Sequence, residues 1–355
     1  MPDIKYKFSY TPYKLIFKEP GGTSRGVLKM KHTYFLRVED PDDPMHIGYG
    51  EVPIFPGLSK ESLHDLERLL GKLTISGKNL ALPEIRSCSS LVFGIEQAIG
   101  SFEQPENIIF PSAFTQGQTS ITINGLIWMG NVHKMMDRVL EKLRTGFSCL
   151  KIKIAAINWE EELDFIRFVR DKGGQDLVIR VDANGGFKPT ECLRKIEQLQ
   201  KYNIHSIEQP IEAGKLREMK EICNLSPIPI ALDEELIGIE PGEYRDQLLN
   251  FLKPQYIILK PALCYGFSGA SDWIRRARAR NIGYWVTSAL ESNVGLTAIA
   301  QFTGSLHPDI PQGLGTGNLF TNNLPSCLML NGEHLRYDKS GVSYKKELEL
   351  LPWKK

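Results

Sequence analysis

Short apolar runs alternate with segments of helical periodicity between residues 119 and 317. The runs are rich in β-branched residues, which is typical of strands buried in a parallel sheet. Eight runs predict strands, at residues 120–125, 149–154, 177–182, 206–208, 228–233, 256–260, 283–287 and 312–314. Seven segments between them predict helices, at residues 132–145, 159–171, 189–201, 215–225, 242–252, 269–280 and 294–303. This alternation predicts an α/β fold in which a parallel sheet closes as a βα barrel.

The chain on either side of this region has a different pattern. Residues 6–17 and 33–39 predict two strands that pair as a hairpin, and residues 60–73 and 91–100 predict helices. We therefore expect residues 1–118 to form a separate α+β module and residues 119–317 to form the barrel. Residues 318–355 contain no further strand–helix unit, so we expect this segment to pack back on the N-terminal module.

Composition narrows the class of protein. The 355 residues include 42% hydrophobic and 24% charged side chains, with 43 basic and 42 acidic residues, as in an ordinary soluble protein. The absence of a basic excess makes nucleic acid an unexpected partner. No apolar run approaches the length of about 18 residues that a membrane span needs, and the N-terminus lacks the pattern of a signal peptide. The six scattered cysteines predict reduced thiols, and together these features predict a cytoplasmic protein of undetermined oligomeric state.

Charged side chains stand at the ends of successive predicted strands. Lys153 is followed after 29 residues by Asp182, after a further 26 by Glu208, after 25 by Asp233 and after 27 by Lys260. One βα unit takes about 30 residues, so this spacing puts the side chains at the carboxyl ends of neighbouring strands. We expect them to converge on one mouth of the barrel.

The chemistry of this set points to a metal ion. Three carboxylates held together raise one another's pKa unless a cation compensates them. Oxygen ligands favour Mg²⁺, which also keeps positions open for a substrate carboxylate. Lys151 and Lys153 lie two residues apart and so face the same side of one strand, where a nearby divalent cation would lower the ammonium pKa from about 10.4. A lysine base beside a metal ion suits removal of a proton α to a carboxylate, since the metal stabilises the enediolate that forms.

Six strings in order carry a family resemblance: LKIKI at residues 150–154, RVDANGG at 180–186, SIEQP at 206–210, ALDEE at 231–235, ILKP at 258–261 and SALESNVG at 288–295. They resemble the enolase superfamily, and within it the muconate-lactonizing subgroup and its o-succinylbenzoate synthase branch. GYGEVPIFPGLS at residues 48–59 and SITINGLIWMG at 120–130 resemble the capping domain and first barrel strand of that branch. The resemblance implies a modified (β/α)7β TIM barrel, with a capping domain built from the N-terminal segment and the C-terminal tail.

The resemblance also implies a role for individual residues. Mg²⁺, for which Mn²⁺ can substitute, would be bound by three carboxylates, Asp182, Glu208 and Asp233. Lys153 would be the base, Lys151 would tune its charge, and Lys260 would face it across the site. Two further side chains would orient these groups, Asn184 and Glu234. The small carboxylate substrate would be contacted by the segment after the seventh strand and by two loops, through Ser288, Ala289, Glu291, Thr316 and Arg25.

The reaction implied by the o-succinylbenzoate synthase branch is a syn dehydration. It converts 2-succinyl-6-hydroxy-2,4-cyclohexadiene-1-carboxylate to o-succinylbenzoate in menaquinone biosynthesis, with Lys153 as base and then as acid. Racemisation of N-succinylamino acids, dipeptide epimerisation and muconate cycloisomerisation share the proton step and stay open as alternatives. Dipeptide epimerases typically place an Asp-x-Asp pair after the eighth strand, where this chain has Gly315, Thr316 and Gly317. A non-catalytic barrel scaffold is a remote alternative, because no metal ligand or lysine of the pattern is missing.

Overall fold

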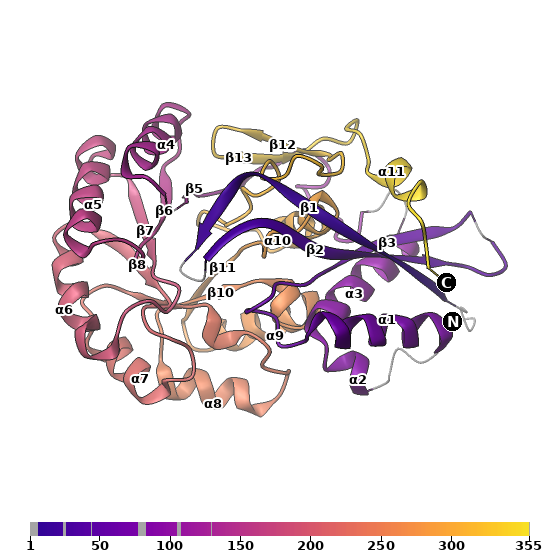
Figure 1. The fold of residues 1–355 in the computed structure, drawn as a ribbon, viewed down its shortest axis with the longest axis horizontal. Helices are drawn as coiled ribbons and strands as arrows, with labels where there is room; N and C mark the ends of the chain where they lie inside the picture. The colour runs from indigo at the N-terminus through magenta and orange to yellow at the C-terminus, as the bar shows by residue number, and fades with distance from the viewer. Residues whose placement is uncertain are drawn as a thin grey trace.

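The computed structural model describes residues 6–23, 26–43, 45–76, 83–104, 108–128 and 130–354. Its largest sheet has seven parallel strands in sequential order, curled so that helices cover its outer face (Figure 1). The strands are β5 (Gly125–Ile127), β6 (Cys149–Lys153), β7 (Val178–Asp182), β8 (Ile204–Glu208), β9 (Ile230–Leu232), β10 (Tyr256–Leu259) and β11 (Gly283–Val286). A helix follows each strand: α4 (Val132–Arg144), α5 (Trp159–Gly173), α6 (Pro189–Gln200), α7 (Leu216–Leu225), α8 (Glu243–Leu252), α9 (Gly266–Arg278) and α10 (Asn293–Ser305).

Residues 312–313 join the two edges of this sheet. Gln312 forms a parallel bridge with Ile123, and Gly313 forms one with Thr287. The amide of Gly313 donates to the carbonyl oxygen of Val286 at 2.8 Å, on the opposite side of the segment from Ile123. The eighth predicted strand is therefore a pair of isolated bridges that closes the sheet, and the predicted barrel of seven βα units with a final strand-like segment is confirmed.

The first predicted strand, at residues 120–125, is wrong in its extent. β4 (Ile121–Thr122) pairs with β13 (His334–Tyr337) of the C-terminal tail, whereas the first strand of the parallel sheet is β5. Gly125 opens β5 where a Cβ atom would lie 2.9 Å from the Leu150 side chain, so its missing side chain lets β5 approach β6. Asn124 and Gly125 interrupt the apolar run between β4 and β5, but the pattern does not show that the chain changes its partner strand there.

The N-terminal module has an antiparallel sheet and its own core. Its strands are β1 (Lys7–Thr23), β2 (Gly26–Glu39) and β3 (Ile47–Pro53), and its helices are α1 (Leu63–Ser76), α2 (Pro83–Arg86) and α3 (Ser89–Glu103). The predicted hairpin is confirmed, since β1 pairs with β2 in a register that opposes Lys7 to Glu39. The helices predicted at residues 60–73 and 91–100 are α1 and α3, whereas β3 was not predicted. Buried side chains of both sheet and helices form a hydrophobic cluster separate from that of the barrel.

The C-terminal tail contacts both parts of the chain. It forms β12 (Leu328–Asn331), β13 and α11 (Lys345–Glu349), and Figure 1 shows its hairpin beside the start of the barrel. Further along, Lys354 and Tyr10 exchange backbone hydrogen bonds of 3.0 and 2.8 Å, which brings the two ends of the chain together. The division of the chain at residues 118 and 317 stays a prediction.

The β1–β2 hairpin extends from the N-terminal module toward the barrel (Figure 1). Its apolar face packs Leu15 and Phe17 against Leu290 and Phe320, which follow the barrel strands. This contact sets the hairpin over the carboxyl ends of the strands. Among the described residues, no helix is long and apolar enough to cross a membrane, and all six cysteines are free thiols.

Candidate active site

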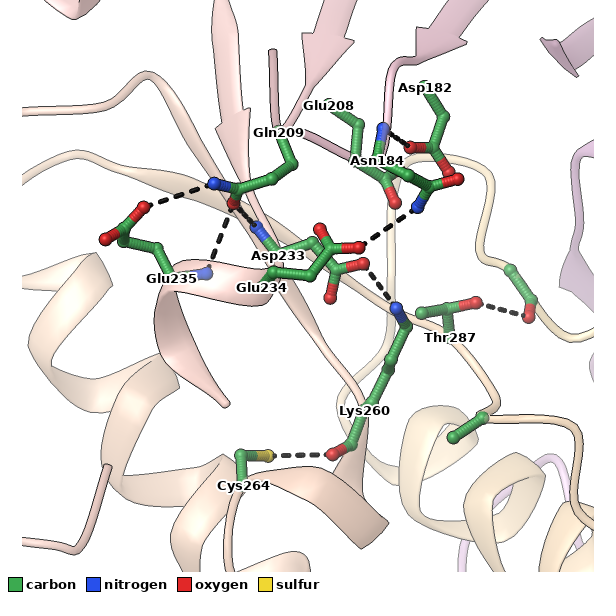
Figure 2. A network of polar contacts seen from close by, with 12 residues as sticks. Asp182, Asn184, Glu208, Gln209, Asp233, Glu234, Glu235, Lys260, Cys264 and Thr287 are labelled. Carbon is green, nitrogen blue, oxygen red and sulfur yellow. Dashed lines mark hydrogen bonds and ion pairs between the residues drawn. The ribbon is translucent and has the colours of Figure 1, made fainter. Parts of the chain in front are cut away.

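The parallel register brings the charged strand ends side by side. Lys153 is level with Asp182, and Asp182 is level with Glu208 on the next strand. Asp233 and Lys260 directly follow β9 and β10. Figure 2 shows the three carboxylates and Lys260 gathered at one end of the strands. The structure thus collects the residues that the spacing predicts, including Lys151 one pleat below Lys153.

Lysines and carboxylates alternate within this group. Nζ of Lys151 lies 2.9 Å from Oδ2 of Asp182 and 2.6 Å from Oε2 of Glu208. Nζ of Lys153 lies 3.2 Å from the same oxygen of Asp182, and Lys260 forms an ion pair with Asp233. The carboxylate side chains are 1–2% exposed and those of the three lysines 11–13%, so the charges interact away from bulk water.

Burial and neighbouring charge shift the pKa values in opposite directions. Burial, reinforced by Asp182, raises the pKa of Glu208 well above its usual range. Burial would also raise the pKa of Asp182, but Lys151 and Lys153 outweigh it and the pKa is lowered. Burial would lower the pKa of Lys151 and of Lys260, but the adjacent carboxylates outweigh it and both are raised. The protein's own charges therefore hold protons on these two lysines, so the predicted lowering of lysine pKa depends on a bound cation.

The donor set suits a hard divalent cation. Asp182, Glu208 and Asp233 offer carboxylate oxygens from three adjacent strands, the ligand type that Mg²⁺ prefers. As placed, no group of three or more His, Cys, Asp or Glu side chains in the described ranges lies close enough together to hold a metal ion. Lys151 and Lys260 instead pair with these carboxylates. The residues fit the ion in chemical type, and binding it requires the carboxylates to turn from the lysines toward a common point.

Asn184 links Lys153 to the surrounding carboxylates. Its side-chain oxygen accepts a hydrogen bond from Nζ of Lys153. Its amide nitrogen donates to Oε1 of Glu234 at 3.1 Å, as Figure 2 shows. Its backbone N–H donates to Oδ1 of Asp182 at 3.0 Å. The left-handed backbone of Asn184, with φ of 44°, turns the chain after β7 so that these three contacts form. Asn184 thus contacts Lys153, Asp182 and Glu234, and the orienting role expected for Asn184 and Glu234 stays a prediction.

Gln209 is a residue of the site that the sequence reasoning missed. Its fully buried carboxamide oxygen accepts from the backbone N–H groups of Asp233 and Glu235, at 3.1 and 3.2 Å. Its amide donates to Oε2 of Glu235 at 3.1 Å (Figure 2). Gln209 therefore fixes the turn that carries Asp233. The signal was present in the strings SIEQP and ALDEE, because their polar residues follow adjacent strands.

One pocket opens over these side chains. Its volume is about 160 Å³, and Lys151, Lys153, Lys260 and Asp182 line its floor. Apolar side chains from the barrel and the N-terminal module form most of the remaining wall: Leu28, Phe55, Leu58, Leu126, Trp128, Trp285 and Leu290. None of these residues was named as a substrate contact, although Leu290 lies in the segment after the seventh strand that was expected to contact the substrate. Phe55 and Leu58 belong to the string that resembles a capping domain.

The predicted substrate contacts are distributed unevenly. Ser288, Ala289 and Thr316 line the pocket, with the hydroxyl oxygens of Ser288 and Thr316 2.7 Å apart. Glu291 is not in the lining: its side chain is fully buried, and its carboxylate accepts from the backbone N–H of Ala289 at 2.7 Å. The structure therefore turns Glu291 toward its own loop. Arg25 lies outside the described residues.

The fold and the site together define a βα-barrel protein with an acid–base centre at the carboxyl ends of its strands, under an N-terminal cap. Residues 134–318 match the family described as enolase C-terminal domain-like. Together with the relatives below, this match shows that the chain belongs to the enolase superfamily.

Two relatives cover nearly the whole chain. It is 42% identical to the o-succinylbenzoate synthase of Desulfotalea psychrophila, over 92% of this chain and 97% of that protein. The crystal structure of MenC from the same organism superposes with a TM-score of 0.83 at 39% identity, covering 94% of this chain and 99% of that one. The D-Ala-D/L-Ala epimerase of Cytophaga hutchinsonii is more distant, at 26% identity over 82% of this chain and 80% of that protein.

Proposed function

We propose that the protein is an o-succinylbenzoate synthase, a hydro-lyase that forms o-succinylbenzoate from 2-succinyl-6-hydroxy-2,4-cyclohexadiene-1-carboxylate in menaquinone biosynthesis. The similarity to the Desulfotalea enzyme over 92% of the chain supports this choice among the reactions of the superfamily. The lysines and carboxylates at the strand ends support removal of a proton by a lysine base, and the size and lining of the pocket support this substrate.

The charge of the pocket carries the proposal. Lys151, Lys153 and Lys260 line it, whereas Asp182 is the one acid among the described lining residues. These lysines form ion pairs with Asp182, Glu208 and Asp233. They become available to a substrate with two carboxylates when the proposed divalent cation compensates the protein's own carboxylates. The wall beyond the lysines is apolar, and a cavity on the order of 150 Å³ holds one benzene ring, so a volume of about 160 Å³ accommodates the six-membered ring.

Mg²⁺, or Mn²⁺ in its place, is the cofactor that we propose for Asp182, Glu208 and Asp233. When bound, the ion would compensate these carboxylates and stabilise negative charge that develops on the substrate's ring carboxylate. Gln209 and Asn184 hold the turns that carry Asp233 and Asp182, through the hydrogen bonds described above.

Lys153 acts first as base and then as acid. Its neutral amine takes the proton from the ring carbon that bears the carboxylate, and Asn184 orients it through the bond to Nζ. The ammonium that forms then gives its proton to the departing hydroxyl group on the same face, which leaves as water while the ring becomes aromatic. Lys260, on the opposite side of the carboxylates, supplies a positive charge beside the reacting ring. Lys153 thus accepts the proton from the ring carbon and delivers it to the hydroxyl group that leaves as water.

The rival reactions differ at the far end of the substrate. A dipeptide carries an ammonium group, and the described pocket lining has no acid apart from Asp182 to hold it. N-Succinylamino acids carry two carboxylates and share the charge pattern, so their racemisation is the alternative that a substrate comparison must separate.

Replacement of Lys153 tests the proposal. With Mg²⁺ and the cyclohexadiene substrate, Lys153→Ala should lose about 10²–10⁴-fold in kcat, the usual contribution of a general acid–base group. Lys7→Ala is the control, because Lys7 also pairs with a carboxylate, Glu39 at 2.7 Å, but is 45% exposed. Full turnover by Lys153→Ala would rule out the proposed base, and no turnover by the unmodified protein would rule out the reaction.

A further inference from the structure

Three ionisable side chains outside the strand-end site are buried together. Lys31 is 4% exposed, and Glu51 and Glu291 are fully buried. Lys31 and Glu51 lie in β2 and β3 of the N-terminal sheet, whereas Glu291 lies between β11 and α10 of the barrel. Charged side chains are almost never buried unless other groups pair with them. This cluster therefore marks a specific connection between the N-terminal module and one barrel loop.

Lys31 binds the backbone of that loop. Its Nζ donates to the carbonyl oxygens of Ala289 and Leu290, at 2.7 Å each. Hydrogen bonds from a charged donor are stronger than those between neutral groups. Leu290 has a left-handed backbone with φ of 61°, which is uncommon for a side chain of this size. The bonds from Lys31 thus stabilise a conformation that the loop does not favour on its own.

The two glutamates hold the loop from its other side. The carboxylate of Glu51 accepts from the backbone N–H groups of Ser292 and Gly295, at 3.0 and 2.9 Å, at the start of α10. Glu291 accepts from the backbone N–H of Ala289 at 2.7 Å. Burial lowers the pKa of Lys31, and the negative charges of Glu291 and Glu51 partly offset this effect. The cluster therefore fixes the loop from Ala289 to the first turn of α10 against the N-terminal sheet.

The opposite face of the same loop is a wall of the pocket. The pocket is lined by Ser288, Ala289 and Leu290 of this loop. It is also lined by Leu28 of β2, which precedes Lys31 by three residues. In Figure 1 the β1–β2 hairpin passes beside α10, in agreement with these contacts. Lys31 therefore binds two residues that line the pocket, Ala289 and Leu290, without lining the pocket itself.

We propose that Lys31 is a positioning residue for the succinyl end of the substrate. It holds the backbone of Ala289 and Leu290 beside the hydroxyl groups of Ser288 and Thr316, which line the same wall of the pocket and which we infer receive the second carboxylate. Recognition of the succinyl group thereby depends on a side chain of the N-terminal module, while the proton step depends on the barrel. This inference rests on the proposed function and adds the residue that controls affinity for the far end of the substrate.

A pair of inhibitors isolates that end. The product o-succinylbenzoate carries both carboxylates, whereas benzoate carries the ring carboxylate alone. In Lys31→Met, inhibition by o-succinylbenzoate should weaken about tenfold, inhibition by benzoate should stay within about twofold, and KM should rise more than kcat falls. Lys29→Met is the matched control, since Lys29 is an exposed lysine on the same strand. Unchanged inhibition by o-succinylbenzoate, or an equal loss for both inhibitors, would overturn the role of Lys31.

Hydrogen exchange tests the same role without a substrate. Backbone amides of residues 288–292 should exchange faster in Lys31→Met than in Lys29→Met, and equal rates would overturn the inference. If Lys31→Met does not fold, the double variant Lys31→Met with Glu291→Gln removes both charges together and should show the same faster exchange. A protein that fails to convert the cyclohexadiene substrate yet shows this change in exchange would disprove the proposed function and leave the positioning role standing.

Discussion

Replacing Glu291 with glutamine should change how stability depends on pH. Glu291 is fully buried, and its carboxylate accepts a hydrogen bond from the backbone N–H of Ala289. Burial raises its pKa to about 7, because the loss of water outweighs the attraction of Lys31, and Glu51 adds repulsion. Between its ordinary value of 4.5 and about 7, the folded protein keeps a proton that the unfolded chain has released. Unfolding therefore releases a proton in this range, and stability falls as the pH rises.

The size of the effect follows from the shift. The pKa of Glu291 is about 2.5 higher in the folded protein than its ordinary value of 4.5. At about 1.36 kcal/mol for each pKa unit, this difference lowers the free energy of unfolding by roughly 3 kcal/mol once the pH exceeds 7. Glutamine does not titrate, and its side-chain oxygen can still accept from Ala289. The free energy of unfolding of Glu291→Gln, minus that of the unmodified protein, should therefore rise by roughly 3 kcal/mol between pH 4.5 and pH 7.5.

Urea unfolding followed by fluorescence at several pH values measures this difference. Glu161→Gln is the control, because Glu161 is exposed and its charge stays in water when the chain folds. Its difference from the unmodified protein should stay nearly flat across the same range. A flat difference for Glu291→Gln as well would show that Glu291 is ionised like a surface carboxylate, and the reasoning from burial would fail.

Two further predictions concern the metal site and the loop. At a free Mg²⁺ concentration of about 100 times Kd, the unmodified protein should gain about 2.7 kcal/mol of stability, measured as a higher Tm. The variant Asp233→Asn replaces a proposed ligand, which is also the partner of Lys260, and should lose most of that gain. An equal gain in the variant would remove Asp233 from the proposed ligands. Gly295→Ala should destabilise the protein by about 1–3 kcal/mol in urea unfolding, because its Cβ would lie 2.9 Å from both Glu291 Cβ and Glu51 Oε2; a neutral result would mean that this contact can open freely.

The barrel was predictable because its signals are local. Apolar runs and helical periodicity each extend over one element, and the observed helices begin within about three residues of the predicted ones. The first strand was misplaced because the prediction of residues 120–125 joined β4 to the start of β5 across Asn124. β3 was missed because its sequence IGYGEVP carries two glycines and a proline, which disfavour a strand, while packing against α3 supports it.

The strand-end site was predictable for a related reason. Because the βα unit repeats at a nearly constant length, residues one unit apart lie at the same level of neighbouring strands. Lys153 and Asp182 are therefore opposite each other in the sheet. No such repeat connects Lys31 to Leu290, which are 259 residues apart. A partial signal existed, since Lys31 alternates with Thr33 and Phe35 on the buried face of β2. The pattern marks Lys31 as inward-facing, but only the packing of the module on the barrel identifies its partner.

The ratio of two specificity constants tests the central claim most directly. With Mg²⁺ present, kcat/KM is measured for dehydration of 2-succinyl-6-hydroxy-2,4-cyclohexadiene-1-carboxylate and for racemisation of an N-succinylamino acid. Both substrates use the same proton step, so their ratio reports how the pocket recognises the rest of the molecule. We predict that dehydration is preferred by at least about 100-fold. An equal or higher kcat/KM for racemisation would contradict the assignment as o-succinylbenzoate synthase.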